Sequence, residues 1–144
     1  MASLAHEPTF LPLTVAAART AAQSQVDPPV RAAAGVVQRR AEEANSAAAE
    51  CWAALLAGCD APGRRALPSR LRALSEATSH YVGSHWWYGT GSPHRRRVSE
   101  AENRIDEAAM EGDGAEFAEA FIGYDQAVAT AVVRVQSTMG SPTA

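Results

Sequence analysis

The sequence contains no lysine, and all thirteen of its basic residues are arginine. Without lysine the chain cannot form a lysine Schiff base. It also cannot carry the usual phosphate-binding loop, GxxxxGK[ST], whose lysine contacts the phosphates. An arginine-only composition is typical of proteins from bacteria with GC-rich genomes. The absence therefore excludes two kinds of active site and favours a bacterial source.

Cysteine is also scarce, with only Cys51 and Cys59 present. If one helix contained both, eight residues would separate them by about 12 Å along its axis, which is too far for a disulfide. The N-terminal stretch FLPLTVAAARTAA lacks the basic start of a signal peptide, and no apolar run approaches the ~18 residues that span a bilayer. We therefore expect a cytoplasmic protein without a membrane partner.

Familiar catalytic and metal-binding motifs are missing. GxSxG, HExxH, GxGxxG and paired CxxC do not occur. His80 and His85 are five residues apart, about 140° around a helix, so they cannot chelate a metal together. The acidic residues between Glu100 and Glu119 are expected on the solvent side of two helices. The sequence predicts no catalytic residue, no metal and no cofactor, which favours a role other than catalysis.

Aromatic residues make up only 6% of the chain, whereas alanine occurs 32 times. A core built from alanine closes only if the helices approach one another closely. Charge is distributed unevenly: residues 1–99 hold eleven arginines and seven acidic residues, whereas residues 100–144 hold two and nine. The two halves can attract each other within one molecule, or they can direct head-to-tail association between molecules.

Apolar residues recur with the period of a helix throughout the chain, and nowhere with that of a strand. Proline, glycine and N-capping residues divide the chain into helices. The expected helices cover residues 11–25, 28–57, 69–87, 92–112 and 113–135, the third capped by Ser69 and the last opened by a capping box, Asp113 to Glu116. We predict an all-α fold: one helical domain over residues 1–144, a mostly antiparallel bundle of about five helices, with an N-terminal arm (1–9) and a C-terminal tail (137–144).

The longest expected helix, residues 28–57, resembles a coiled-coil strand rich in alanine. Its apolar positions are separated alternately by four and three residues, the 3.5-residue repeat of a coiled-coil seam. Either the other helices cover this seam or a second copy of the chain does. The candidate association seam comprises Val30, Ala34, Val37, Ala41, Ala44, Ala48 and Leu55, with Cys51 buried among them.

The last helix is the most apolar. Between Phe117 and Val135 a narrow polar ribbon contains Glu119, Gly123, Gln126, Thr130 and Arg134. The remaining circumference is wide enough to need cover on more than one side. This helix is expected at the centre of the bundle.

The stretch HWWYGTGSPHRRR contains the one candidate binding site. Three arginines occupy the first turn of a helix, where unpaired amides already carry partial positive charge and cations are unfavourable. An anion or a partner's carboxylate would compensate, and the neighbouring aromatic residues could stack or pack against it. The simpler explanation is that the arginines pair with the acidic half of the chain. The candidate anion- or partner-binding residues are Trp86, Trp87, Tyr88, His94, Arg95, Arg96 and Arg97.

Three functions are consistent with these observations. The first is a non-enzymatic assembly module that binds protein, by self-association or as an adaptor in a larger bacterial or phage complex. The second is a nucleic-acid- or anion-binding regulator that uses the Trp86–Arg97 segment, although the net charge of −3 opposes it. The third is a small-ligand-binding bundle or an enzyme, with a site near His80, Tyr81 and His85.

Overall fold

The structure is a computed structural model that describes residues 9–59 and 62–140, without the side chains of residues 62–63 and 136–140. Within these residues every regular element is a helix, so the predicted all-α class is confirmed. There are six helices where about five were expected: α1 (Pro12–Ser24), α2 (Pro28–Ala57), α3 (Pro62–Val82), α4 (Ser84–Tyr88), α5 (Ser92–Glu111) and α6 (Gly114–Gly140).

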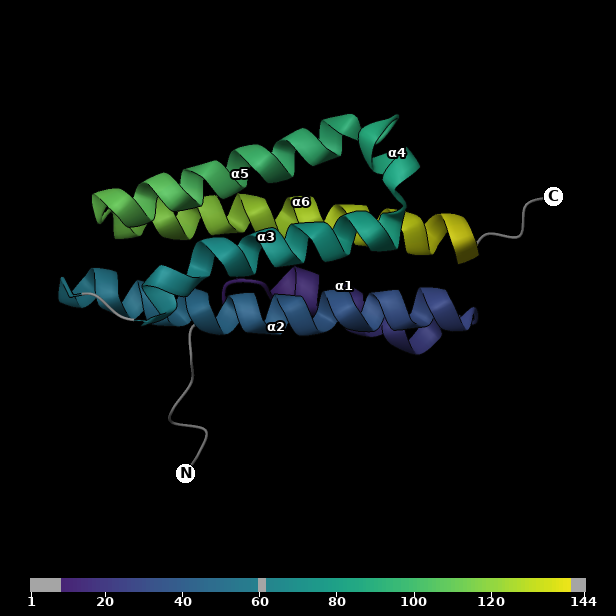
Figure 1. Cartoon of the computed structure of the whole chain (residues 1–144), viewed down its shortest axis with the longest axis horizontal. Coiled ribbons are helices and arrows are strands. Elements are labelled where there is room, and N and C mark those ends of the chain that lie inside the picture. The colour runs from purple at the N-terminus through teal and green to yellow at the C-terminus, as the bar shows by residue number, and fades with distance from the viewer. Residues whose placement is uncertain (1–8, 60–61, 141–144) are drawn as a thin grey trace, which may run out of the picture.

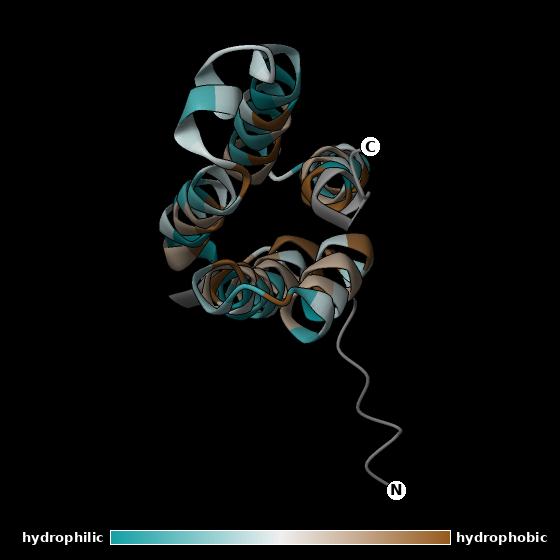
Figure 2. Ribbon diagram, turned by 90° about the vertical axis from the view of Figure 1, so that its right-hand side faces the viewer, coloured by the Kyte–Doolittle hydropathy of each residue, from teal (hydrophilic) through white to brown (hydrophobic). Residues whose placement is uncertain are grey.

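The five long helices lie roughly parallel to one axis (Figure 1), and short connections make successive neighbours run antiparallel. Viewed along that axis they form a ring in the order α1, α2, α3, α5, α6 (Figure 2). The contacts are most extensive between α2 and α3, and least between α3 and α5. The joint between α3 and α5 is therefore the loosest in the ring.

The core fills the interior of this ring. Each helix contributes the stripe that its periodicity predicts, and the largest side chains come from α3 and α6. At one end of the bundle, Phe10, Trp52, Phe117 and Phe121 form a cluster with ring centroids 5.1–6.2 Å apart. Trp52 stacks on Phe117 with 28° between the ring planes, and the other pairs are tilted or edge-on. Few aromatic residues are needed because alanines fill the closely packed α2 interfaces.

Three predicted boundaries were wrong. The third helix begins at Pro62, and Ser69 does not cap it but donates its hydroxyl to the Ala66 carbonyl, 2.9 Å away. The same helix ends at Val82 because Gly83 adopts φ +94°, a conformation that favours glycine, and a separate helix α4 follows. At the C-terminal end, α6 continues to Gly140, so the tail expected from residue 137 is helical as far as the structure describes it.

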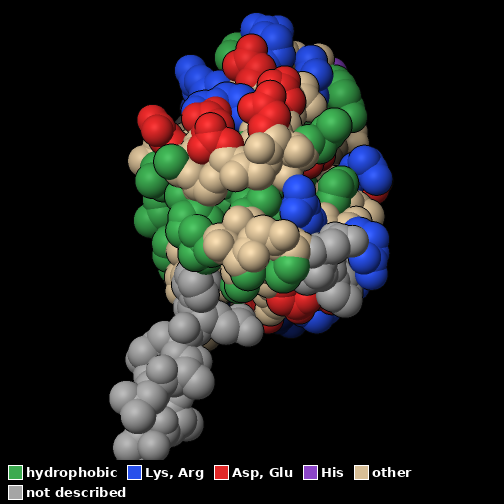
Figure 3. Space-filling model, turned by 90° about the vertical axis from the view of Figure 1, so that its left-hand side faces the viewer, with side chains coloured by type: hydrophobic (Ala, Val, Ile, Leu, Met, Phe, Trp, Pro, Cys, Tyr) green, Lys and Arg blue, Asp and Glu red, His purple; other side chains and the backbone are tan. Residues whose placement is uncertain are grey.

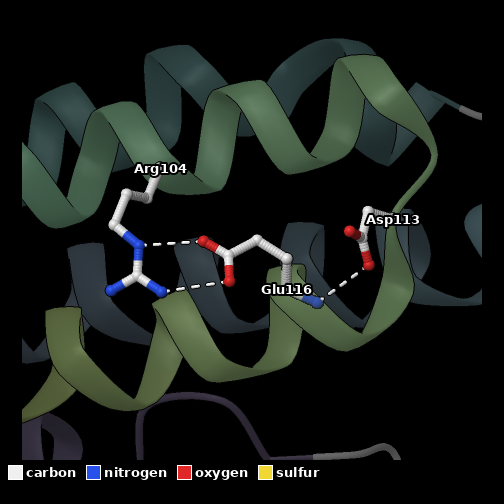
Figure 4. Close-up of polar contacts among 3 residues, drawn as sticks. All are labelled: Arg104, Asp113 and Glu116. Atoms are coloured by element: carbon white, nitrogen blue, oxygen red, sulfur yellow. Dashed lines mark hydrogen bonds and ion pairs between the residues drawn. The ribbon is translucent and has the colours of Figure 1, made fainter.

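The turn between α5 and α6 follows the prediction. Helix α5 ends at Gly112, whose φ of +70° suits glycine, and the Glu116 amide donates to Asp113 Oδ1 at 3.0 Å, as the first half of a capping box requires (Figure 4). The Glu116 carboxylate does not complete the box. It accepts two hydrogen bonds from Arg104 on α5, at 2.9 and 3.1 Å, and so links the two helices (Figure 4).

Side chains from other helices cap the start of α1. Asn45 Oδ1 on α2 accepts the amides of Phe10 and Leu11, at 2.7 and 3.1 Å. The two carboxylate oxygens of Asp125 on α6 accept the amides of Leu13 and Thr14, at 3.0 and 2.8 Å. The residue between these pairs is proline, which has no amide hydrogen. The start of α1 therefore depends on two helices distant in the sequence.

Candidate functional site

The tryptophans of the Trp86–Arg97 segment are structural. Trp87 is buried in the core. Trp86 packs against the His94 ring, with 5.4 Å between the two ring centroids. The Arg134 guanidinium lies over the Trp86 ring, 5.5 Å from its centroid. A Cβ on Gly91 would approach the Trp86 ring carbons to 2.6 Å, so the loop needs glycine there for close packing. Both indoles thus take part in packing within the chain.

The anion site predicted at the start of α5 relied on unpaired amides, and the amides of this turn are paired within the loop. The Ser92 amide donates to the Gly89 carbonyl at 3.0 Å, and the amides of His94 and Arg95 both donate to the Gly91 carbonyl, at 2.9 and 3.1 Å. Helix α5 begins at Ser92, and Pro93 lies in its first turn. Backbone carbonyls of the loop thus accept the hydrogen bonds that the prediction had assigned to an external anion.

The three arginines also do not converge on one site. Arg95 lies over the Tyr88 ring, 5.1 Å from its centroid, and lines a cleft between α3 and α5. Arg97 lines a different hollow, with His94, between α5 and α6. Arg96 is exposed. Successive residues point about 100° apart around a helix, so three adjacent arginines cannot share a single anion.

Some residues of the predicted site line a cleft between α3 and α5. It has a volume of about 320 Å³, at the lower end of the range for small-molecule sites. Trp87, Tyr88 and Arg95 were predicted and lie along it. The prediction missed its other lining residues, Arg72, Ser75, Glu76 and Ser79 on α3 and Val98, Ser99 and Glu102 on α5.

A chain of hydrogen-bonding groups leads from the cleft into the core. The Ser75 hydroxyl lies 3.0 Å from Glu102 Oε1 and 3.0 Å from the Tyr124 hydroxyl, which in turn lies 3.2 Å from the Leu71 carbonyl oxygen. The Ser75 hydroxyl donates to Glu102 and the Tyr124 hydroxyl donates to the Leu71 carbonyl, while either hydroxyl could be the donor between Ser75 and Tyr124. The chain thus fixes Glu102 as a hydrogen-bond acceptor at the edge of the cleft.

Glu102 and Asp106 were expected on the solvent side, and this was wrong. Both are half-buried, and burial raises the pKa of each carboxyl, while the nearby Arg72 guanidinium lowers it in part. Asp106 Oδ1 is buried without a hydrogen-bond partner among the described residues. The acidic face of α5 thus divides into an exposed part and a part that faces α3.

The candidate association seam lies inside the single chain. Helices α1 and α3 cover it, and Ala34, Val37, Ala41, Ala44 and Ala48 are all at most 1% exposed, with Val30 and Leu55 half-buried beside them. The structure thus decides between the two alternatives: the chain's own helices occupy the seam, and a second copy would have to displace them. Cys51 is buried as expected, and burial raises the pKa of its thiol.

The third predicted site does not form an enclosed pocket. Tyr81 is buried, and its hydroxyl accepts a hydrogen bond of 3.0 Å from the Gln25 side chain. His80 and His85 are both exposed. In the part of the chain that the structure describes, no group of three or more His, Cys, Asp or Glu side chains is placed to hold a metal ion.

The sequence did not point to an apolar surface that α1 and α6 share. Leu13, Ile122 and Val133 are 50–60% exposed on it. Two hollows of about 350 and 630 Å³ run along the junction of the two helices, and Leu13 and Gln126 line both of them. We call this surface the α1–α6 face and define it by Leu13, Ala17, Ile122, Gln126, Ala129 and Val133.

No family model, curated protein or solved structure matches the chain, so no relative supplies a function for these sites. None of the helices described is both long enough and apolar enough to span a membrane.

Proposed function

We propose that the protein is a helical self-association module in which two copies pack through their α1–α6 faces. The observation that carries the proposal is the exposure of Ile122 (60%), Leu13 (50%) and Val133 (50%) on one surface. Single exposed apolar residues are common on proteins, but contiguous groups mark interaction sites.

The α1–α6 face is also poor in charge. Arg19 is the only charged residue of α1. Between Ala120 and Val135, α6 has two charged residues, the buried Asp125 and the exposed Arg134. The end view in Figure 3 shows charged side chains gathered at the top, over the α5–α6 hairpin, and hydrophobic side chains below them on the left. A highly charged partner would find few counter-charges here, because Arg134 is the one exposed charged residue that lines the two hollows, whereas a second copy presents an equally charge-poor face.

The spacing of the residues along α6 suits a two-fold arrangement. Ile122, Gln126, Ala129 and Val133 are separated by four, three and four residues, an order that reads the same in both directions. In an antiparallel pair, Ile122 of each copy therefore meets the Val133 region of the other, where the larger hollow lies. Such self-complementary contacts are the rule in two-fold dimers.

The test is the oligomeric state of an Ile122→Arg variant, measured by size-exclusion chromatography with light scattering. We expect the wild type to be dimeric and Ile122→Arg to be monomeric, because the substitution places a charge in an apolar contact. Met110→Arg is the matched control: Met110 is 82% exposed on α5, outside the face, and this variant should remain dimeric. A wild-type monomer at high concentration would overturn the proposal.

Cysteine cross-linking tests the two-fold geometry. In a Cys59→Ser background, which removes the exposed native thiol, Gln126→Cys should form a disulfide between two copies because it lies close to the expected axis. Ile122→Cys should not pair with its own counterpart, since the antiparallel arrangement separates the two by about 16 Å along the helix. Cross-linking of Ile122→Cys in place of Gln126→Cys would contradict the antiparallel arrangement.

A further inference from the structure

The α3–α5 cleft brings together charges of both signs that do not pair with one another. Arg72 and Arg95 lie along it with Glu76 and Glu102. Within the described part of the chain, neither arginine makes an ion pair with these glutamates. The one specific contact that Arg95 makes is with the Tyr88 ring, and its Nε is buried without a hydrogen-bond partner. Buried polar groups in a native structure are usually satisfied, so an unsatisfied one needs an explanation.

The helix register keeps the opposite charges of α5 apart. Arg95 and Glu102 are seven residues apart, so they occupy the same side of the helix about 10 Å from each other. Tyr88 holds Arg95 at the α4 end of the cleft, and Ser75 holds Glu102 further along it with a hydrogen bond of 3.0 Å. Arg95 therefore marks a cationic end of the cleft, and at the other end Glu102 and the nearby Asp106 outnumber the single Arg72, which leaves that end anionic.

The position of the cleft in the fold also suits a ligand. It lies at the loosest joint of the ring, where α3 and α5 have few contacts. Its wall at the α4 end is the rigid core residue Trp87, which is 4% exposed. Hydroxyl groups of Ser75, Ser79 and Ser99 lie between the charged ends, so the lining between them is polar.

We propose that the α3–α5 cleft binds a small zwitterion, with its carboxylate at Arg95 and its ammonium group at Glu102. This ligand class matches a site with separate cationic and anionic ends better than a simple anion or cation does, because each end of the ligand compensates one end of the cleft. The proposal is independent of self-association, since the cleft lies on α3 and α5 and the dimer face lies on α1 and α6.

The probe for the first experiment is 6-aminohexanoate, which carries a carboxylate and an ammonium group at opposite ends of an alkyl chain. Hexanoate and hexylamine are its single-charge counterparts. Calorimetric titration of the full chain should show saturable binding of 6-aminohexanoate, and binding of each counterpart should be weaker by about tenfold or more. Equal binding of hexanoate would overturn the zwitterion assignment, and so would no binding of the three compounds.

Variants then locate the two ends. Arg95→Gln and Glu102→Gln should each weaken 6-aminohexanoate binding by about tenfold or more. Arg96→Gln and Glu107→Gln make the same charge changes at exposed positions of α5 outside the cleft, and they should bind as the wild type does. Thermal unfolding by circular dichroism shows whether each variant folds. A folded Arg95→Gln that retains full binding, or an Arg96→Gln that loses it equally, would overturn the proposal.

Discussion

At the residue scale, Glu102 shows how a carboxyl can oppose the stability of its own fold. Burial raises its pKa, so the folded protein holds this proton to a higher pH than the unfolded chain does. Folding therefore favours the neutral form, and stability falls as the pH rises from the ordinary carboxyl pKa through the raised one. The hydrogen bond that Ser75 donates to Glu102 opposes this effect in part, because it stabilises the carboxylate.

The substitution Glu102→Gln tests this effect. Glutamine has nearly the same shape without the charge, so the variant should be more stable than the wild type at neutral pH. The difference should disappear at pH values below the ordinary carboxyl pKa, where the wild-type Glu102 is protonated in both states. Urea unfolding measured over a series of pH values provides the comparison.

The matched control for this prediction is Glu107→Gln on the exposed side of α5, which should change the free energy of unfolding by no more than about 0.5 kcal/mol. A stabilisation by Glu102→Gln that is the same at every pH would contradict the explanation. If the cleft binds a zwitterion as proposed, the same variant gains stability and loses binding, a combination that a purely structural role does not produce.

Sequence periodicity could not assign Glu102 correctly. The apolar stripe of α5 contains Val98, Ala101, Ile105 and Ala108, and all four are buried as predicted. Glu102 borders this stripe, and a bordering residue faces either solvent or a neighbouring helix. The pattern of one helix does not say on which side its neighbour packs. The same reason explains why Asp125, which borders the buried Tyr124, was missed as the cap of α1.

At the element scale, α2 shows what periodicity predicts well. Its ends at Pro28 and Ala57 agree with the prediction, because Asp27-Pro28 and Gly58 are strong local signals that no tertiary contact overrides. The five central residues of its seam are buried, and the two at the ends, Val30 and Leu55, are half-buried. The pattern could not predict what packs against the seam, because a 3.5-residue repeat is equally typical of helices that pack within one chain and between two chains.

The substitution Ala44→Leu tests the role of this seam. Ala44 is fully buried between closely packed helices, so a larger side chain should overpack the interface and lower the free energy of unfolding by about 1–3 kcal/mol. Ala53→Leu on the exposed side of α2 should change it by no more than about 0.5 kcal/mol. Denaturant unfolding gives both values, and light scattering should show the wild-type oligomeric state for both. An Ala44→Leu variant that dissociates while keeping its stability would show that the seam joins two copies.

The segment from Pro62 to Tyr88 was predicted least well. Pro68 lies inside α3, although proline usually ends a helix or kinks it, so the sequence placed the start of this helix after Pro68. Gly83 was expected to continue the helix, because glycine within an apolar repeat is tolerated and its φ cannot be inferred from the pattern. The existence of a helix was predictable here, and its limits depended on packing against α2.

At the scale of the whole molecule, charge and apolar surface occupy different sides, and this determines how association responds to salt. If the charge-poor α1–α6 face joins two copies, added salt should not dissociate the dimer. Head-to-tail attraction between the basic and acidic halves of the chain would weaken instead, because about 1 M salt shortens the screening length to about 3 Å. Light scattering at low and high salt separates the two, and dissociation at high salt would favour the head-to-tail alternative.

The caps of α1 also have a consequence for the order in which the chain folds. Asp125 accepts the amides of Leu13 and Thr14 across more than a hundred residues of sequence, so α1 obtains its cap from a helix that is synthesised much later. Contacts of such long sequence separation form late, because the intervening chain must be ordered first. We expect α2 and α3 to pair as a hairpin during synthesis, while α1 waits for α6 to leave the ribosome. Closure of the ring between α1 and α6 is then the last step in the folding of these helices.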